Sequence, residues 1–469
     1  NLSVFLRVDA VGSEEIYGSP YLLTVHPTDT YAPNCDAYGE GLSYGVAGSV
    51  MQVDLVARDV YYNLRETGGD VIFMRIINTA ARVAYSGECE DFGNGNYTCT
   101  VTPNSYGNYA LSLTNANDEH IANSPYDIFI DYGPASGAST AEGAGLSVAV
   151  AGVQANFTVQ VRDVYSNKRL EGGDSVTATL TSNSSTGVIT GSCVHTTDGL
   201  YECGYVAQAA GTQTLEVSVV GESIVDSPFT VQVSDGRQEG TYTTAAGDGL
   251  YSSVAGKEAE FEVIVRDLYG NLRSGDDTLT VTLQPLNTSL NRLVDEPEVV
   301  YGQVDPIGLG FYRVSYNTTV RGIHTLNVTL TVAGGEAEHI SGSPWFPYTQ
   351  AAETTAATTT VTGTGLEHGM AGVFAPIDLQ AQDIFGNYQE TSGDAFYIDV
   401  AGWAGSPWFE AVEESGFFED LGRAGKYSGG YTITKAGNYT VSVTQAQPGY
   451  LEAVYFDMPD LQFRSYPDC

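Results

Sequence analysis

Polar and apolar residues alternate along residues 156–161 in the pattern of a β-strand. Phe157, Val159 and Val161 are separated by single polar residues, so they share one face of an extended chain. This period of two is typical of a strand with one buried and one exposed face. The alternation ends at the pair Arg162–Asp163, and a Gly-Gly-Asp sequence then marks a turn before the next expected strand.

The same strand and turn occur four times along the chain. The copies span residues 52–70, 156–174, 260–276 and 376–394. Each contains an aspartate followed two residues later by an aromatic residue and four residues later by Asn: Asp59, Asp163, Asp267 and Asp383, with steps of 163−59=104, 267−163=104 and 383−267=116. A period near 100 residues exceeds the roughly 20 to 50 residues of solenoid repeats. It matches a whole β-sandwich, so we expect a linear array of domains with separate cores.

Further short motifs recur in a fixed order. Gly-x-Gly-Leu and Ala-Gly come first, within residues 39–48, 143–152, 247–256 and 363–372. A Gly-x-Tyr motif expected to begin a late strand occurs at residues 95–97, 199–201, 310–312 and 429–431. A strand with Ser-Pro closes three copies at residues 121–130, 224–233 and 340–348, and the fourth has Met458–Pro459 instead. This order resembles the filamin-type (ABP280-like) immunoglobulin-like repeat over nearly the whole chain.

The resemblance implies an all-β chain, a linear array of four immunoglobulin-like β-sandwich domains preceded by a partial domain. The expected filamin-type repeats are residues 31–132 (repeat 1), 133–234 (repeat 2), 235–350 (repeat 3) and 351–469 (repeat 4). Cytoplasmic filamins join such repeats to an actin-binding domain. Nothing in this sequence resembles that domain, so actin cross-linking is not expected.

Residues 1–30 are expected to be the C-terminal strands of an incomplete repeat, because residues 16–25 resemble the closing strands. Two strands cannot bury a sandwich core alone. Either the sequence is a fragment of a longer repeat protein, which we favour, or these strands complete a domain on another chain, as in donor-strand complementation.

The chain is strongly acidic, with 57 acidic and 19 basic residues and a formal net charge of −38 at pH 7. This charge argues against nucleic acid as a partner, because phosphates require a basic surface, and against anionic membrane surfaces. Solubility and repulsion between neighbouring domains explain the charge. Calcium at domain junctions is the alternative, although no EF-hand loop is present, and no other cofactor is expected. No stretch approaches the roughly 18 apolar residues of a membrane span.

Four of the six cysteines form two pairs with the same spacing. Cys89 and Cys99 are ten residues apart, as are Cys193 and Cys203, and both pairs lie at the same place in their repeats. Adjacent antiparallel strands joined by a tight turn would bring each pair within disulfide reach. Free buried thiols are the alternative, and zinc is disfavoured because no second cysteine pair lies nearby. Disulfides imply an oxidising compartment.

The other two cysteines occupy junctional positions. Cys35 precedes the Gly-x-Gly-Leu motif of repeat 1 and Cys469 ends the sequence, each after a closing strand. We therefore hypothesise that they form intermolecular disulfides or bond to segments outside this sequence.

Eight Asn-x-Ser/Thr sequons are candidate N-glycosylation sites: Asn1, Asn96, Asn156, Asn183, Asn287, Asn317, Asn327 and Asn438. Asn156, Asn327 and Asn438 alternate with expected core residues and should project from the exposed face of a strand, where a glycan fits. Together with the paired cysteines and the small number of lysines, these sequons predict a secreted or cell-surface protein with covalent glycans.

No motif indicates catalysis. Ser43 is the centre of a Gly-x-Ser-x-Gly match, but that motif requires a strand-to-helix elbow in an α/β sheet. The recurrent aspartates are expected to accept hydrogen bonds from backbone N–H groups in turns, because an acid–base role would not recur in every repeat. Trp403 and Trp408 lie in an insertion of repeat 4 that is either additional packing, which we favour, or a ligand surface. No catalytic, cofactor-binding or metal-binding residue is predicted.

These features predict a structural protein rather than an enzyme, namely a subunit or segment of an extracellular glycosylated filament, coat or surface appendage. Its partners would be copies of itself, joined head to tail by strand complementation through residues 1–25. The alternative is a cell-surface adhesion or recognition ectodomain that binds other surface proteins through exposed sheet edges.

Overall fold

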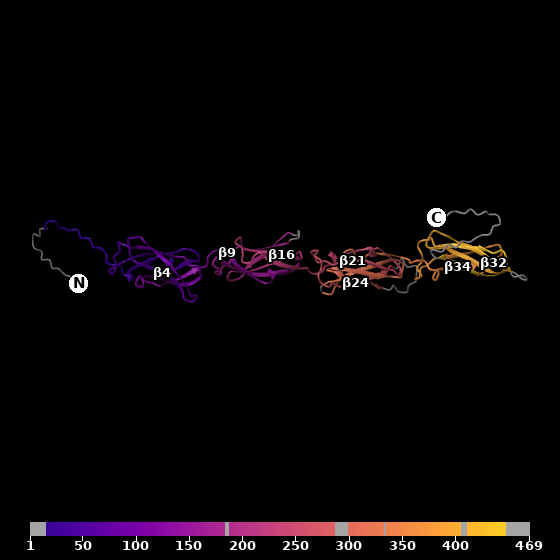
Figure 1. The fold of residues 1–469 in the computed structure, drawn as a ribbon, viewed down its shortest axis with the longest axis horizontal. Coiled ribbons are helices and arrows are strands. Elements are labelled where there is room, and N and C mark those ends of the chain that lie inside the picture. Colours follow the sequence, from indigo (N-terminus) through magenta and orange to yellow (C-terminus); the bar gives the residue numbers. More distant parts are fainter. Residues whose placement is uncertain (1–15, 183–186, 287–298, 333, 405–409, 447–469) are drawn as a thin grey trace, which may run out of the picture. The chain divides into compact units, whose positions relative to one another are not determined.

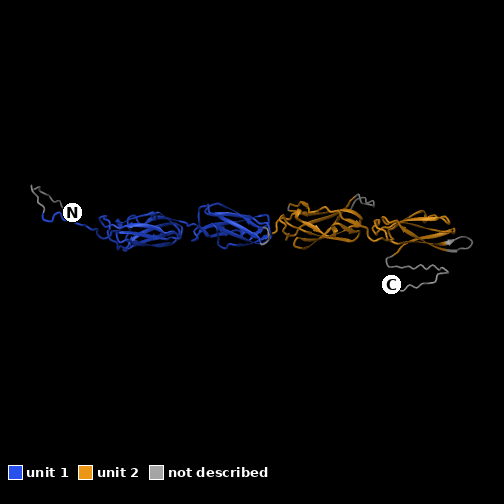
Figure 2. Ribbon diagram, turned by 90° about the horizontal axis from the view of Figure 1, so that it is seen from above, with its two compact units in different colours: residues 1–233 blue, residues 234–469 orange. Residues whose placement is uncertain are grey.

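A computed structural model of the chain describes residues 16–182, 187–286, 299–332, 334–404 and 410–446 (Figure 1). Strands and short 3-10 turns (η) make up the secondary structure of these residues, which confirms the predicted all-β class. The chain divides into two compact units, residues 1–233 and 234–469 (Figure 2), and each contains two immunoglobulin-like sandwiches. Within the described ranges, no helix is both long and apolar enough to cross a membrane.

Repeat 1 is a sandwich whose two sheets share one long strand. Its elements are η1 (Ala32–Asn34), β1 (Asp36–Tyr38), η2 (Glu40–Leu42), β2 (Tyr44–Val46), β3 (Met51–Val56), β4 (Ile72–Asn78), β5 (Val83–Asp91), β6 (Asn96–Val101), β7 (Gly107–Asn115) and β8 (Tyr126–Asp131). The strand order is β1-β3-β6-β5 in one layer and β5-β4-β7-β8-β2 in the other. The first half of β5 pairs with β4 and the second half with β6. The closing strand β8 pairs antiparallel with β7 and parallel with β2.

Repeat 2 has the same arrangement in two separate sheets. Its elements are β9 (Ala135–Glu142), η3 (Ala144–Leu146), β10 (Val148–Val150), β11 (Gln154–Asp163), β12 (Val176–Ser182), β13 (Val188–Thr190), β14 (Ser192–His195), β15 (Leu200–Val206), β16 (Gly211–Val219), β17 (Glu222–Ser223) and β18 (Phe229–Ser234). The sheets have the orders β14-β15-β11-β9 and β10-β18-β16-β12-β13, with β17 beside β16.

Repeat 3 follows the pattern of repeat 2. Its elements are η4 (Gly240–Tyr242), β19 (Thr244–Ala246), η5 (Asp248–Leu250), β20 (Ser252–Val254), β21 (Glu258–Ile264), β22 (Leu279–Pro285), β23 (Val300–Tyr301), β24 (Gln303–Gly308), β25 (Phe311–Asn317), β26 (Gly322–Thr331), β27 (Ala337–His339) and β28 (Tyr348–Gln350). The sheets have the orders β19-β21-β25-β24 and β20-β28-β26-β22-β23, with β27 beside β26.

Repeat 4 differs at its end. Its elements are β29 (Thr360–Thr362), η6 (Thr364–Leu366), β30 (Phe374–Gln380), β31 (Phe396–Ala404), β32 (Glu410–Asp420), β33 (Lys426–Thr432) and β34 (Gly437–Gln445). The order is β29-β30-β33-β32-β31-β34, so β34 ends the sheet among the described residues. The insertion extends the β31–β32 hairpin, in which Trp403 lies opposite Ala411, and Trp408 lies outside the described residues.

Alternating apolar residues build the core of each sandwich. In β11, Phe157, Val159 and Val161 are at most 3% exposed, so this predicted strand is confirmed. Each repeat has its own cluster of buried side chains. Because burying one large aliphatic side chain contributes roughly 1.5–3 kcal/mol, each cluster can hold its sandwich together without the others.

A tyrosine in each late strand closes the turn that ends in aspartate by accepting a hydrogen bond from the backbone N–H of that aspartate. The tyrosine–aspartate pairs are Tyr97–Asp70, Tyr201–Asp174 and Tyr312–Asp277, with distances of 3.1, 2.9 and 2.9 Å. In repeat 4 the same role belongs to Tyr427, which accepts from Asp394 at 3.0 Å. The predicted position of this motif, residues 429–431, is therefore wrong. Tyr431 instead donates to the Gly365 carbonyl oxygen, as Tyr205 does to that of Gly145.

Candidate functional site

The recurrent aspartate is a buried acceptor at the centre of a tight turn. Asp163 is fully buried, and its Oδ1 accepts from the backbone N–H of Tyr165 at 3.0 Å and of Asn167 at 2.9 Å. Its Oδ2 accepts from the Asn167 side-chain amide at 2.7 Å and from the Gly133 N–H at 2.8 Å. Because Gly133 lies at the entry to repeat 2, the carboxylate ties the start of the repeat to its central turn.

The other three aspartates make the same four hydrogen bonds, and all are fully buried. Their donors are Thr28, Tyr61 and Asn63 for Asp59, Gly236, Tyr269 and Asn271 for Asp267, and Ala352, Phe385 and Asn387 for Asp383. Burial alone would raise the pKa of Asp59, but the hydrogen bonds outweigh it and lower this pKa to about 2. The carboxylates are thus structural acceptors in turns.

The turn of repeat 2 also contacts repeat 1. The Asn167 side chain donates to the Asn104 carbonyl oxygen at 3.0 Å and accepts from the Tyr106 N–H at 3.1 Å. The ring of Tyr165 lies against Gly48, where an added Cβ would stand 2.5 Å from a ring carbon. The asparagine and the aromatic residue of the turn therefore form one contact surface, because both side chains reach the same end of the preceding sandwich.

The turn of repeat 4 contacts repeat 3 in the same way. The Asn387 side chain donates to the Thr319 carbonyl oxygen at 2.9 Å and accepts from the Arg321 N–H at 3.1 Å. The ring of Phe385 lies against Gly256, again 2.5 Å from the position of an added Cβ. These contacts link segments more than 60 residues apart in sequence, so no local pattern predicts them.

Both predicted cysteine pairs lie on adjacent antiparallel strands. Cys89 on β5 is disulfide-bonded to Cys99 directly opposite on β6, with Cα atoms 3.9 Å apart. Cys193 on β14 is bonded to Cys203 on β15, with Cα atoms 4.1 Å apart. Cys99 and Cys203 are 0% and 2% exposed, so each disulfide has one side in a hydrophobic core.

Repeats 3 and 4 have other residues in place of the cysteine. By strand register, the place of Cys203 is taken in repeat 3 by the buried Val314, opposite Val304. In repeat 4 it is taken by Gly429, opposite Phe418. The disulfide is therefore an addition to a fold that repeats 3 and 4 form without one.

Cys35 is fully buried in repeat 1, a position that disfavours the hypothesised intermolecular disulfide. Its Sγ lies 3.5 Å from the Tyr31 carbonyl oxygen and accepts from the Arg58 N–H at 3.5 Å. Burial raises the pKa of the thiol, and a buried, protonated thiol is unreactive toward another chain. Cys469 lies outside the described residues.

Most of the described sequons are accessible. Four asparagines are exposed: Asn96, Asn156, Asn317 and Asn438. Asn327 is half-buried, and Asn1, Asn183 and Asn287 lie outside the described residues. Exposure on a strand leaves room for a glycan at these four positions.

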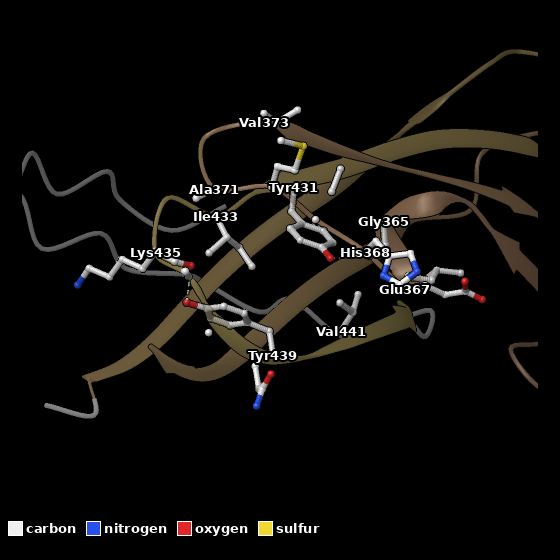
Figure 3. A pocket seen from close by; sticks show the side chains of 17 residues that line it. Gly365, Glu367, His368, Ala371, Val373, Tyr431, Ile433, Lys435, Tyr439 and Val441 are labelled. Atoms are coloured by element: carbon white, nitrogen blue, oxygen red, sulfur yellow. Dashed lines mark hydrogen bonds between the residues drawn. The ribbon is translucent and has the colours of Figure 1, made fainter. Parts of the chain in front are cut away.

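An open groove lies beside β34 in repeat 4. Its volume is about 350 Å³, and Tyr431, Ile433, Tyr439 and Val441 surround it while Lys435 points away (Figure 3). In repeats 1, 2 and 3 the closing strand pairs with the equivalent strand, as β8 with β7, β18 with β16 and β28 with β26. Among the described residues, no strand pairs with this side of β34.

The remaining candidates for chemistry have structural roles. Ser43 follows η2, and its hydroxyl donates to the Glu40 carbonyl oxygen at 3.2 Å. His324 is buried in repeat 3, its Nδ1 lies 3.0 Å from the Gly322 carbonyl oxygen, and burial lowers its pKa. In the ranges that the structure describes, no three His, Cys, Asp or Glu side chains gather in a way that could hold a metal.

Comparison with known proteins identifies the repeats. A family model described as "Filamin/ABP280 repeat" matches residues 29–127, 134–230 and 240–345. Filamin-C of Rattus norvegicus is 26% identical over 245 residues, 51% of this chain and 8% of that protein. The E3 ubiquitin-protein ligase TRIM71 of Bos taurus is 28% identical over 103 residues, 22% of this chain and 12% of that protein. The chain thus spans about a tenth of the length of these relatives. The solved structure of FdeC, an Escherichia coli adhesin, gives a TM-score of 0.40 at 16% identity and covers 69% of this chain and 99% of that one.

Proposed function

Since the chain belongs to the filamin/ABP280 repeat family, we propose that it is a structural segment of an extracellular or cell-surface filament, coat or appendage. The observation that carries the proposal is the pair of equivalent junctions, in which Asn167 and Asn387 bind the preceding sandwich. Sandwiches that touch through side chains as well as short linkers resist bending, because a bend must break those contacts. A chain of this kind serves as a spacer, with no enzymatic step.

The oxidised cysteines support an extracellular location. Disulfides persist in oxidising compartments and are rare where glutathione keeps thiols reduced. Exposed sequons such as Asn96 and Asn156 would carry glycans in the same compartment. With a net charge of −38, the surface would stay hydrated and would repel neighbouring chains except where specific contacts form.

The alternative function is a cell-surface adhesion or recognition ectodomain. One observation favours it: β9 and β14 are the outer strands of one sheet in repeat 2. An outer strand presents backbone N–H and C=O groups to which a partner's extended segment can add. Under this alternative, the chain would be anchored to a cell surface, and an outer strand far from that surface would bind the partner.

The native protein tests the proposal directly. Mass spectrometry of peptides from its source should find the 89–99 and 193–203 disulfides and glycans on Asn96 and Asn156, and electron microscopy should show the chain within filaments or a coat. Reduced cysteines with unmodified asparagines would refute the extracellular role. Correctly modified but isolated molecules that bind another surface protein would favour the adhesion ectodomain.

A further inference from the structure

The groove of repeat 4 exposes apolar surface where the other repeats carry a closing strand. Met370 beside it is 74% exposed, whereas the equivalent Val150 of repeat 2 is 41% exposed. Ala371 is exposed as well. Its equivalents in the other three repeats are buried: Ala47 is 3% exposed, Ala151 3% and Ala255 1%. The groove therefore suits an extended segment with alternating apolar side chains.

Residues 16–25 carry that pattern. Ile16 lies three residues before Ser19, and Leu23 and Val25 lie three and five residues after Pro20. In the closing segments of the complete repeats, the equivalent apolar residues are at most 5% exposed: Ile121, Ile128, Ile130, Ile224, Val231, Val233 and Ile340. In residues 16–25 the same positions are 80%, 82% and 79% exposed. Among the described residues, no core thus covers these three apolar side chains, and their exposure to water is unfavourable.

The serine of the closing segment provides a specific polar contact. Its hydroxyl oxygen accepts from a backbone N–H in three repeats: Ser124 from Leu113, Ser227 from Val217 and Ser343 from Val328, at 2.9, 2.9 and 3.0 Å. Each donor lies six residues after the glycine that begins its strand. The equivalent donor on β34 is Val443, and Ser19 has the hydroxyl to bind it.

Residues 447–469 of the same chain are the alternative occupant, but their sequence fits less well. Met458 stands in place of the serine and has no hydroxyl. Counting from Pro459, Gln462 and Arg464 take the two positions that are buried and apolar in repeats 1 and 2. Burying these polar side chains would carry a desolvation penalty that Leu23 and Val25 avoid.

Docking of residues 16–25 would also bring the turn of repeat 1 to the end of repeat 4. Pro20, the proline of residues 16–25, lies 59−20=39 residues before Asp59, the aspartate of the next turn. The corresponding spacings at the two junctions described above are 163−125=38 and 383−344=39. Tyr61, which is 73% exposed, and Asn63 then take the places of Tyr165 and Asn167.

The end of repeat 4 has the matching surface. The Gly372 N–H donates to the Ile433 carbonyl oxygen at 2.7 Å, as the Gly48 N–H does to that of Pro103. No other described atom lies within 4 Å of a Cβ added at Gly372, whereas a ring occupies this place at Gly48. Asn104 and Tyr106 lie three residues and one residue before Gly107. Thr434 and Ala436 have the same positions before Gly437, so Thr434 supplies the carbonyl oxygen and Ala436 the N–H for an incoming asparagine.

We propose that residues 16–25 of one copy fill the groove of repeat 4 in a second copy, and that Tyr61 and Asn63 then bind the end of the completed repeat. The register of β7 and β8 places Leu23 opposite Tyr439 and Thr24 opposite Asn438. This inference rests on the proposed structural role and specifies how two copies join.

Sedimentation velocity of the full chain over a range of concentrations at physiological salt tests the donor segment. Leu23→Asp places a charge in the core, whereas Leu22→Asp changes an outward position that Asp127 occupies in repeat 1. The unmodified chain and Leu22→Asp should associate alike, and Leu23→Asp should associate roughly 10- to 100-fold more weakly. A monomeric unmodified chain, or equal association of the two variants, would overturn the proposal.

Cross-linking tests the register. Thr24→Cys chains mixed with Asn438→Cys chains should form a disulfide-linked dimer under mild oxidation, and Leu22→Cys chains mixed with the same partner should not. Equal yields from the two mixtures would show that residues 447–469 or another segment fills the groove. Disulfides and glycans of the native protein are independent of both results, so the wider proposal stands if only this inference fails.

Discussion

Replacing Cys89 and Cys99 with valine should lower the free energy of unfolding of repeat 1 by about 2.7 kcal/mol. The double substitution reproduces the Val304–Val314 pair of repeat 3, so apolar packing between the two strands is kept and only the cross-link is lost. The cysteines are ten residues apart. A loop of that length removes about 9 cal/mol/K of entropy from the unfolded chain, which gives the figure above at 25 °C.

Hydrogen exchange read by mass spectrometry is the suitable assay, because peptides report each repeat separately within the full chain. The most protected amides of repeat 1 should exchange roughly 100-fold faster in the variant, and those of repeats 3 and 4 should be unchanged. The reverse substitution, Val304→Cys with Val314→Cys, should slow exchange in repeat 3 to a similar degree. Unchanged protection in repeat 1 would refute the loop-entropy argument, and a loss spread over all repeats would refute their separate stability.

Three further outcomes are expected. Asp163→Asn replaces an acceptor oxygen with an NH₂ group that faces two donors, and should destabilise repeat 2 by about 3 kcal/mol in chemical denaturation. Tyr312→Phe removes the acceptor of the Asp277 N–H and should cost repeat 3 about 1 kcal/mol in the same assay. Because burial lowers the pKa of His324 below 6.5, the unfolded state binds more protons as pH falls below that value, and repeat 3 should lose stability there. His324→Gln, which copies Gln213 of repeat 2, should abolish this dependence, and a variant that loses stability equally between pH 7 and pH 5 would refute the assignment.

The array of sandwiches could be predicted because its signals are local and repeated. The alternation around Phe157 marks a half-buried strand wherever it occurs, and steps of 104, 104 and 116 residues between the recurrent aspartates show that each unit is the size of a domain. The late strand of repeat 4 was placed wrongly because it contains two Gly-x-Tyr sequences, ending at Tyr427 and Tyr431. The hydrogen bond from the Asp394 N–H to Tyr427, which forms only in the folded repeat, shows which tyrosine closes the turn.

The functional surfaces were less predictable, because they depend on residues far apart in the chain. The sequence placed the cysteine pairs on neighbouring strands, since ten residues suit a hairpin. It gave no sign that Cys35 is buried, because that depends on contacts with Tyr31 and Arg58 after folding. The bond between Asn167 and Asn104 spans 63 residues and has no local signature.

The Asp-x-aromatic-x-Asn turn stabilises its own sandwich and also holds that sandwich in contact with the preceding one. Asp163 orients the Asn167 side chain through a 2.7 Å bond, and the same side chain then binds Asn104 and Tyr106 of the preceding repeat. The junction is therefore formed only when the turn inside the repeat is intact. Unfolding of repeat 2 would therefore also break its contact with repeat 1, and unfolding of repeat 4 would break its contact with repeat 3.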